Sequence, residues 1–235
     1  MHYCISDLHG RYDLFRAMLK KINFNDKDTL FVLGDFVDRG SEGLHAILDV
    51  AKRDNVICIM GNHDCTALSI LLNLRMGIRP ENLEKMKEII DVWVGDGGRE
   101  TYAEYQSLTS EEQKRVLAAM DAFRNYAVAA VGDRKFVLCH GGIKNYTPAK
   151  PLSDYTVEDF AFTRADYTKP IFSEEGKFLV TGHTPTICIE GGEKGKILKA
   201  FDHIAIDCGA VFGFGLGCLR LEDLEEFYVN DEDLK

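Results

Sequence analysis

The chain has 235 residues, of which 46% are hydrophobic and 28% charged, a composition typical of a folded globular protein with a sizeable core. Its formal net charge of −10 argues against nonspecific binding to nucleic acid or anionic membranes, and its apolar stretches are too short to span a membrane. Because Met1 leads directly into the first apolar run and no Cys-x-x-Cys pair occurs, we expect a cytoplasmic protein whose seven cysteines are reduced.

Five short apolar runs, bounded by glycine and rich in β-branched or aromatic residues, predict buried strands. Between the first three runs, apolar side chains recur at helical spacing over 11–21 and 42–53, and a third helix should follow Asp64. This β-α-β-α-β order predicts a largely parallel sheet with right-handed crossovers. The apolar runs cover residues 3–5, 30–33, 56–60, 136–139 and 178–180.

A helical insert is expected at about 80–125, where the alternation of strand and helix stops. Helical patterns cover 81–92 and 110–123, separated by the glycine-rich segment 95–98. Thr109, followed by acids in the first turn, predicts the start of the second helix. The insert would either cap the functional site or only pack against the sheet.

Strands dominate the second half, which should form a more mixed or antiparallel sheet. Glycine-containing turns at 132–133 and 191–192 predict hairpins, and the acidic tail 230–233 should fray. We therefore expect an α/β (α+β) fold in which two packed mixed β-sheets, a β-sandwich, are flanked by helices in a single domain, 1–235. The predicted strands are 126–131, 135–139, 178–181, 204–206, 216–221 and 227–229.

Each of the five apolar runs ends at residues that could bind a metal ion or a phosphate. Because open α/β sheets bind ligands beyond the carboxyl ends of their strands, these residues should meet at one edge. Asp7 and His9 are two residues apart, so both side chains can face one ion, and Asp35 could bridge to a second ion. The second ion would be completed by Asn62, His140 and His183.

Carboxylate and imidazole ligands suit borderline divalent ions. We expect two divalent metal ions, with manganese as the first choice and iron, zinc or nickel as alternatives. The water between two such ions becomes hydroxide near neutral pH and can attack phosphorus in line, without a nucleophile from the protein. The pattern therefore indicates metal-dependent phosphate chemistry.

Three further residues are candidates for contacts with the substrate. Arg39 could grip two phosphate oxygens through its guanidinium. His63 is placed to protonate the leaving oxygen, and Asp38 could hold its other ring nitrogen or could only form a salt bridge with Arg39. Asp207 fits better as the cap of a tight turn before Gly209 than as a ligand. Surface or packing roles are expected for His2, His45 and His203.

Five motifs in order resemble the signature of the calcineurin-like metallophosphoesterases, and within them most closely the phosphoprotein phosphatases of the small bacterial and phage-lambda type. The resemblance implies a helix-flanked β-sandwich, a two-metal centre and direct hydrolysis of phosphomonoesters. It also implies that Arg164 is a second arginine that grips the phosphate, together with Arg39, Asn62 and His63. The motifs are Asp-Leu-His-Gly (7–10), Gly-Asp-Phe-Val-Asp-Arg-Gly (34–40), Gly-Asn-His-Asp (61–64), His-Gly-Gly (140–142) and Gly-His-Thr-Pro (182–185).

Asp64 departs from the protein phosphatases, which mostly carry glutamate at this position. Aspartate is more typical of symmetrical diadenosine tetraphosphate hydrolases and other nucleotide-acting relatives. Because its side chain is one methylene shorter, it could also alter the support of Arg39.

The resulting hypotheses differ in substrate. The first is a metal-dependent serine/threonine protein phosphatase, and the alternative is a symmetrical diadenosine tetraphosphate hydrolase or another nucleotide phosphohydrolase. A metal-binding scaffold without activity is disfavoured because Asp38, Arg39 and His63 are all present. The partner would be a phosphoprotein or a phosphorylated small molecule or nucleotide, with no stable nucleic-acid or membrane binding. The sequence does not indicate an oligomeric state.

Overall fold

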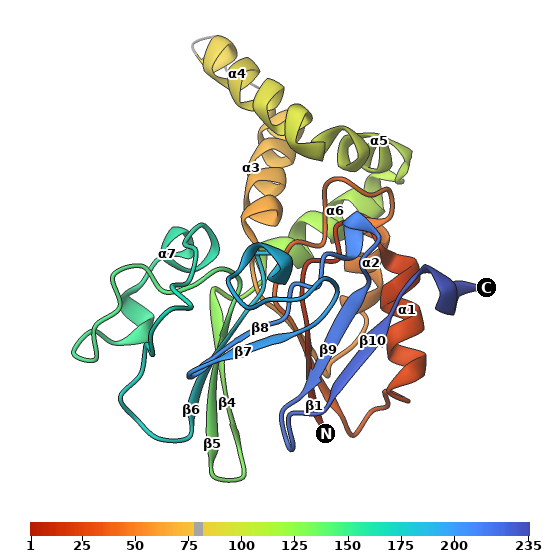
Figure 1. Ribbon diagram of the computed structural model, residues 1–235. Coiled ribbons are helices and arrows are strands. Elements are labelled where there is room, and N and C mark those ends of the chain that lie inside the picture. Colours follow the sequence, from red (N-terminus) through yellow and green to blue (C-terminus); the bar gives the residue numbers. More distant parts are fainter. Residues whose placement is uncertain (78–81) are drawn as a thin grey trace.

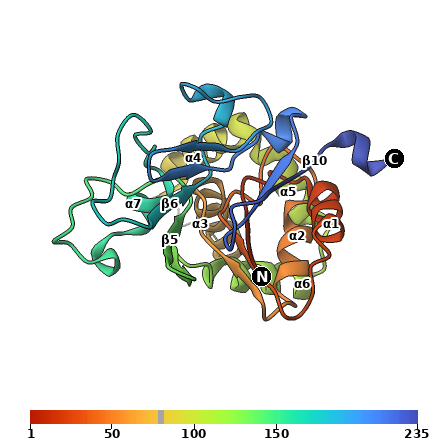
Figure 2. The same ribbon diagram turned by 60° about the horizontal axis from the view of Figure 1, so that its bottom comes forward.

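The fold is built around two five-stranded β-sheets that pack face to face (Figures 1 and 2). It is taken from a computed structural model that describes residues 1–77 and 82–235. The first sheet contains, in spatial order, β10 (Glu226–Val229), β9 (Leu216–Arg220), β1 (His2–Ile5), β2 (Thr29–Val32) and β3 (Val56–Cys58). Strands β1, β2 and β3 are parallel and are connected through α1 (Tyr12–Lys21) and α2 (Gly43–Val50). The predicted β-α-β-α-β unit is thus confirmed.

The second sheet contains, in spatial order, β4 (Tyr126–Val131), β5 (Arg134–Cys139), β6 (Lys177–Thr181), β8 (His203–Ala205) and β7 (Leu198–Ala200). Its three central strands run parallel, whereas β4 and β7 are antiparallel to their neighbours. The glycine turn at 132–133 joins β4 to β5 as predicted. Both sheets are therefore mixed, in agreement with the expected fold class.

Two predictions about the second half of the chain were wrong. Strands β9 and β10 return to the first sheet, where β9 pairs with β1, instead of extending the second sheet. The 191–192 turn does not form a hairpin, because the flanking residues lie outside strands and Gly192 only closes a turn onto the carbonyl of Ile189. The hairpin forms instead between β7 and β8, where Ala200 pairs with His203.

Alternation of side chains along the strands produces three hydrophobic layers. In β1, Cys4 lies in the cluster between the two sheets, whereas Tyr3 and Ile5 lie in the cluster that includes the helices. In β5, Phe136 and Leu138 point inward toward the first sheet. The outer face of the second sheet carries a third cluster, made of Val137, Cys139, Ile143, Tyr155, Phe160, Phe172 and Leu179.

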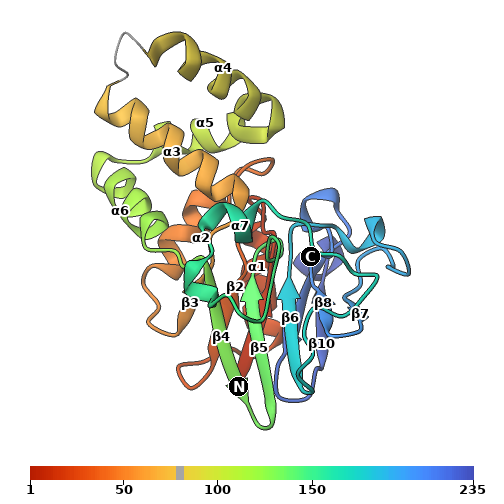
Figure 3. The same ribbon diagram turned by 90° about the vertical axis from the view of Figure 1, so that its left-hand side faces the viewer.

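Helices α3 (Asn62–Met76), α4 (Leu83–Trp93) and α5 (Arg99–Ser107) rise above one edge of the sheets (Figures 1 and 3). A π-helical turn at Val94–Gly98 links α4 to α5, and α6 (Ser110–Asp121) follows. The capping box of Thr109 and Glu112 is confirmed. Helix α3 begins earlier than predicted, so Asp64 lies within its first turn.

The sequence did not predict α5 or the short helix α7 (Val157–Ala161). Helix α5 buries only three residues, two of which are Thr101 and Glu104, so it lacks the apolar stripe on which helix prediction depends. The predicted start of the insert, Pro80 and Glu81, lies outside the described residues. The division of the chain into one domain with an insert stays a prediction.

The acidic tail was expected to fray but is held against α1. Residues Asp231–Leu234 form a 3₁₀ turn that begins when the Asn230 side chain accepts a hydrogen bond from the amide of Glu232. Arg11 pairs with Asp231. All seven cysteines are free, and within residues 1–77 and 82–235 no helix combines the length and the apolar character needed to cross a bilayer.

Candidate metal centre

The predicted ligands come together at the edge where the parallel strands end, below α3 in Figure 1. Two groups of side chains bring their ligand atoms within 4.8 Å of one another, and Asp35 belongs to both groups. A carboxylate shared in this way is placed as the sequence predicted for a bridging ligand. The first group is His9, Asp35 and His63, and the second is Asp35, His140 and His183.

Asp7 was predicted to share the first ion with His9, but that group contains His63 in its place. Asp7 is buried and lines the same cavity of about 130 Å³. Its carboxylate accepts hydrogen bonds of 3.1 and 3.0 Å from the backbone amide of His183. Asp7 therefore lies at the site and also fixes the loop that carries His183.

The site loops have an unusual backbone conformation. Six of the ten described non-glycine residues with positive φ belong to the predicted site. Residues other than glycine rarely adopt this region, and strain of this kind is tolerated where the surrounding structure enforces it. Gly61 permits the close approach of two loops, because a Cβ there would overlap the Asp35 carboxylate. The six residues are Asp7, His9, Asp35, Asp38, Arg39 and His183.

Backbone carbonyls orient two of the histidines. The Nδ1 of His9 lies 2.9 Å from the carbonyl oxygen of Val37, and the Nδ1 of His140 lies 2.7 Å from that of Leu33. Because a carbonyl can only accept, each Nδ1 must carry the hydrogen, and each Nε2 is then free to present a lone pair. Ligating histidines are commonly fixed in this way by a second hydrogen bond.

The surroundings of His140 favour a positive charge. Its Nε2 lies 3.0 Å from Asn62 Oδ1, 3.1 Å from His183 Nδ1 and 3.3 Å from Asp35 Oδ2. Burial opposes a charged imidazole, but the Asp35 carboxylate outweighs burial and raises the pKa of His140 to about 10. Several acceptors that point at one place require a proton or a metal ion between them. The donor set thus fits a bound cation.

Buried carboxylates strengthen this conclusion. Asp7, Asp35 and Asp207 are each at most 4% exposed, and no ion pair among the described residues joins any of them to a lysine or arginine. Carboxylates that remain charged when buried need a cation nearby. For Asp207, burial, followed by the charge of Asp7, raises the pKa well above its usual range, so this carboxyl is held in its neutral form unless a cation lies nearby. Asp207 also accepts a 2.9 Å hydrogen bond from the amide of Gly209, which confirms the predicted turn cap.

His63 and Asp38 are in contact as predicted. The Nδ1 of His63 lies 2.8 Å from Asp38 Oδ2, and Asp38 is fully buried. Burial disfavours the charged imidazole, yet the hydrogen bond to Asp38 raises the pKa of His63 above its usual value. Among the described residues the ion pair of the Arg39 guanidinium is with Asp96, at 3.2 Å, whereas that of Asp38 is with His63. Of the two roles that the sequence left open for Asp38, the structure thus shows the contact with His63.

The helical insert supplies the other partners of Asp38. Trp93 donates its indole N–H to the carboxylate at 3.0 Å, and Thr101 donates its hydroxyl at 2.7 Å. Asp96, at the π-helical turn, lines the metal cavity together with Arg39. The sequence analysis did not predict these contacts with Asp38. The insert thus reaches the site, as one of the two readings of the sequence expected.

Replacing Trp93 by phenylalanine should destabilise the protein. The substitution keeps an aromatic ring at a position that is 3% exposed but removes one donor from a buried carboxylate, which costs about 1–3 kcal/mol. Urea denaturation followed by circular dichroism measures this loss. Thr101→Val removes the neighbouring donor and should have a comparable effect, whereas wild-type stability in both variants would contradict this account of Asp38.

Arg39 and Arg164 border the cavity. The guanidinium of Arg39 approaches the Nε2 atoms of His9 and His63, each at 2.9 Å. Arg164 donates to the hydroxyl of Thr184 at 2.9 Å, beside His183. Two cations thus lie next to the predicted metal ligands, as binding of an anionic substrate requires in a chain of net charge −10.

Asp64 contacts the backbone of the loop that leads to Arg39. Its carboxylate accepts hydrogen bonds from the backbone amides of Phe36, Val37 and Gly61, at 2.9, 3.3 and 3.2 Å. Burial, together with the charge of Asp35, raises the pKa of Asp64 to about 7. Asp64 therefore fixes the loop after β2, and any influence on Arg39 passes through the backbone.

The fold and the grouped ligands define the class of the protein, a metallophosphoesterase. The chain belongs to the calcineurin-like phosphoesterase family, whose sequence model matches residues 3–215. Members of this family use a dinuclear centre of divalent metal ions, and the two ligand groups described above could hold such ions. The predicted superfamily is thus confirmed.

Curated relatives resemble only part of the chain. A symmetrical bis(5'-nucleosyl)-tetraphosphatase of Wigglesworthia glossinidia brevipalpis is 36% identical over 92 residues, which are 38% of this chain and 33% of that protein. Its counterpart in Delftia acidovorans is 33% identical over 91 residues, 38% of this chain and 32% of that protein. The matched segments span about a third of these relatives. Their names do not support the more specific resemblance to phosphoprotein phosphatases.

Solved structures agree with the fold over almost the whole chain. A crystal structure of a candidate diadenosine tetraphosphatase matches with a TM-score of 0.65 and 16% identity, covering 97% of this chain and 92% of the other. A protein serine/threonine phosphatase from Saccharomyces cerevisiae matches with a TM-score of 0.56 and 14% identity, covering 97% and 78%. At these identities the likeness shows a shared fold alone.

Proposed function

We propose that this protein is a hydrolase of dinucleoside tetraphosphates that uses two divalent metal ions, manganese first among them. The observation that carries the proposal is the convergence of the two ligand groups on Asp35, with two arginines at the same cavity. The names of the curated relatives and the aspartate at position 64 favour a nucleotide substrate over a phosphoprotein. The proposal therefore adopts the alternative that the sequence left open.

The roles of the residues follow from their positions. When bound, the metal ions would supply Lewis acidity and an activated water. Arg39 and Arg164 would bind phosphate oxygens. His63, oriented by Asp38, would donate a proton from Nε2 to the leaving oxygen. Asn62 and His63 would also contact the phosphate, and the ions would be held by Asp7, His9, Asp35, Asn62, His140 and His183.

Arg39 must change partners for these roles to hold. Its Nη1 lies 2.9 Å from His9 Nε2, and its Nη2 lies 2.9 Å from His63 Nε2. A single lone pair on Nε2 serves either the guanidinium or a metal ion, and a protonated Nε2 cannot accept from Arg39. We therefore infer that Arg39 turns from the histidines to the phosphate when metal and substrate bind.

Replacing Arg39 by alanine should chiefly weaken the binding of the phosphate. A charge-assisted hydrogen bond contributes about 1.5–3 kcal/mol, so KM should rise by about ten- to a hundredfold while metal content stays near the wild-type value. Steady-state kinetics on an aryl phosphate, together with elemental analysis, measures both effects. Arg39→Lys keeps the charge but loses the paired donors and should recover only part of the loss. Unchanged kinetics in the alanine variant would remove Arg39 from the site.

The substrate assignment is tested by direct competition. Manganese-loaded protein is offered diadenosine tetraphosphate and a phosphoserine peptide, and the products are separated by chromatography. A symmetrical cleavage yields two molecules of ADP, whereas an asymmetrical one yields ATP and AMP. Faster turnover of the peptide would overturn the nucleotide assignment in favour of a protein phosphatase. Absence of any product from either substrate and from an aryl phosphate, with any divalent ion, would contradict a catalytic role altogether.

A further inference from the structure

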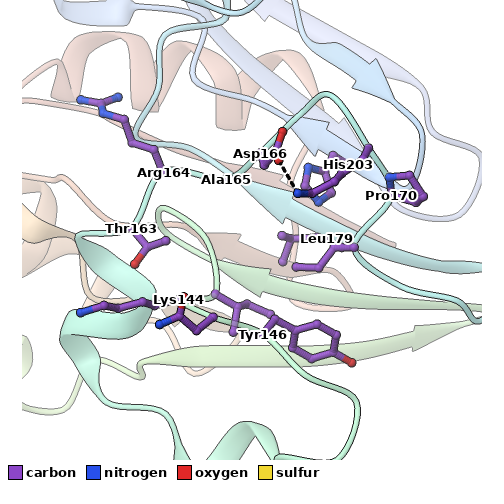
Figure 4. Close-up of a pocket in the computed structure, with 13 residues that line it drawn as sticks. Lys144, Tyr146, Thr163, Arg164, Ala165, Asp166, Pro170, Leu179 and His203 are labelled. Atoms are coloured by element: carbon purple, nitrogen blue, oxygen red, sulfur yellow. Dashed lines mark ion pairs between the residues drawn. The ribbon is translucent and has the colours of Figure 1, made fainter.

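A second cavity, of about 500 Å³, lies beside the metal cavity and shares Arg164 with it. Figure 4 shows Lys144 and Tyr146 on one side of this cavity, Asp166 and His203 on the opposite side, and the side chain of Arg164 pointing away from it. We propose that this cavity binds the nucleoside end of the polyphosphate substrate. The inference rests on the proposed function and names where the substrate extends beyond the reacting phosphate.

The sizes of the two cavities require such an extension. The metal cavity, at about 130 Å³, is smaller than the 300–1,000 Å³ of sites that enclose a drug-sized ligand. It can hold the reacting phosphate but not the nucleoside attached to it. The second cavity, at about 500 Å³, falls within that range. Arg164 joins the two, because it lines both cavities and its guanidinium donates to Thr184, the residue that follows His183.

The charged residues that line the two neighbouring cavities favour this cavity as the place where a polyphosphate binds. Lys144 and Lys169 line it and Arg164 borders it, and among the described residues Lys169 pairs with Asp166 at 2.9 Å. The competing cavity, of about 460 Å³, shares His63 with the metal site. Its described lining includes Glu88 and Asp96 but no lysine or arginine, so it would repel a polyphosphate chain. The polyphosphate should therefore extend past Arg164.

His203 provides a polar group that the fold itself does not use. The side chain lines the cavity and is 2% exposed, and neither ring nitrogen has a hydrogen-bond partner among the described residues. Burial lowers the pKa of His203, so the imidazole is neutral and offers one donor and one acceptor. The edge of a nucleobase also carries donors and acceptors, which could pair with the acceptor and the donor of the imidazole. The imidazole of His203 packs against the ring of Tyr167, at 5.4 Å between ring centres, and this contact leaves both nitrogens without a hydrogen bond.

Tyr146 offers an aromatic face for the base. It is partly buried, and its ring packs edge-on against Phe172 with 5.3 Å between centres, which fixes its orientation. Stacking on an aromatic side chain is a common mode of binding for bases. The cavity thus combines two lysines, Lys144 and Lys169, with an aromatic wall and a neutral imidazole, which together match a nucleotide better than a peptide.

The test compares two double variants that each remove two positive charges. Lys144→Ala/Lys169→Ala changes the cavity, whereas Lys27→Ala/Lys114→Ala is the control, since neither of these exposed lysines lines a cavity described here. The readout is the ratio of kcat/KM for diadenosine tetraphosphate to kcat/KM for an aryl phosphate. Loss of the charge-assisted contact from Lys144, together with the charge of Lys169, should lower this ratio about tenfold or more in the first variant only. An equal ratio in both variants would overturn the proposal.

A third variant, His203→Phe, separates recognition of the base from charge. It fills a similar space without buried polar atoms, so the melting temperature should not fall, while the same ratio should decrease. If His203 only packs against its neighbours, the ratio will stay at the wild-type value, and that result would overturn the role of His203 in base recognition.

Calorimetry with adenosine tests the proposed nucleoside site independently of the proposed hydrolysis of dinucleoside tetraphosphates. Adenosine carries no phosphate and therefore reports on the cavity apart from the metal centre. If the dinucleotide is hydrolysed and the ratio of the two kcat/KM values is unchanged in all variants, the proposed nucleoside site is wrong and the proposed function is retained. Absence of dinucleotide hydrolysis, with adenosine binding that His203→Phe abolishes, would overturn the function and retain a nucleoside site. Absence of both would overturn both.

Discussion

Replacing His63 by asparagine should lower kcat by about 10²–10⁴-fold while the metal content stays near the wild-type value. The imidazole is the only group at this position that can deliver a proton, and Asp38 holds it in place at 2.8 Å. Asparagine is similar in length and can donate its amide to Asp38, but it cannot act as an acid at neutral pH. The loss should therefore appear in catalysis and not in assembly of the site. Single-turnover kinetics and elemental analysis measure the two effects separately.

The metal content decides between two roles for His63. Its ligand atom lies in the same group as those of His9 and Asp35, so geometry alone also permits a metal ligand. A ligand would lose metal on substitution, and loss of both ions from His63→Asn would contradict the role of general acid. Asp38→Asn is the matched variant, because it keeps the contact but weakens the preference for a protonated imidazole. It should reduce kcat less than His63→Asn does, with both ions retained.

The strand ends could be predicted because their signals are local. Apolar runs stop at glycine and then at Asp7, Asp35 or His140, and parallel strands bring their carboxyl ends to one edge. The return of β9 and β10 to the first sheet could not be predicted in this way. Pairing between β1 and β9 joins residues more than 200 positions apart, such as Cys4 and Leu219, and no local pattern specifies which sheet accepts a strand.

Partners that act through a single donor were also missed. Trp93 and Thr101 satisfy the buried carboxylate of Asp38, yet each is one polar atom on a helix without a metal-ligand motif. His203 was assigned to surface or packing, because burial without a hydrogen-bond partner cannot be seen in a sequence. The sequence left open whether the insert caps the site or only packs against the sheet. Contacts between distant segments are therefore what the structure adds.

One residue of the motifs favoured the proposed nucleotide substrate over a phosphoprotein. Most motif positions do not separate the two substrate classes, whereas Asp64 pointed to the nucleotide-acting relatives. The structure shows that its carboxylate holds three backbone amides around the loop after β2. A longer glutamate would have to move that loop or its own backbone to make the same contacts. Residue 64 thus affects the site through the loop that its side chain holds in place.

Replacing Asp35 by asparagine should abolish binding of both metal ions and reduce activity to background. Asp35 belongs to both ligand groups, with Oδ2 at 3.3 Å from His140 Nε2 and 3.6 Å from His9 Nε2. An amide has no charge and presents only one acceptor oxygen, so it cannot bind two cations through two oxygens. It also cannot offset the mutual repulsion of two divalent ions. Metal stoichiometry after manganese saturation and dialysis measures the effect.

Asp28→Asn provides the matched control for this experiment. Asp28 is also buried, at 7% exposure, but it pairs with the amino group of Met1 and lies outside the two ligand groups. Its substitution should lower stability modestly and leave two ions bound. If Asp35→Asn unfolds the protein, circular dichroism will show it, and the comparison then passes to Asp35→Glu, which keeps the charge and should retain more metal than the amide. Two ions bound to folded Asp35→Asn would contradict the bridging role, because the remaining ligands would then be sufficient without a shared carboxylate.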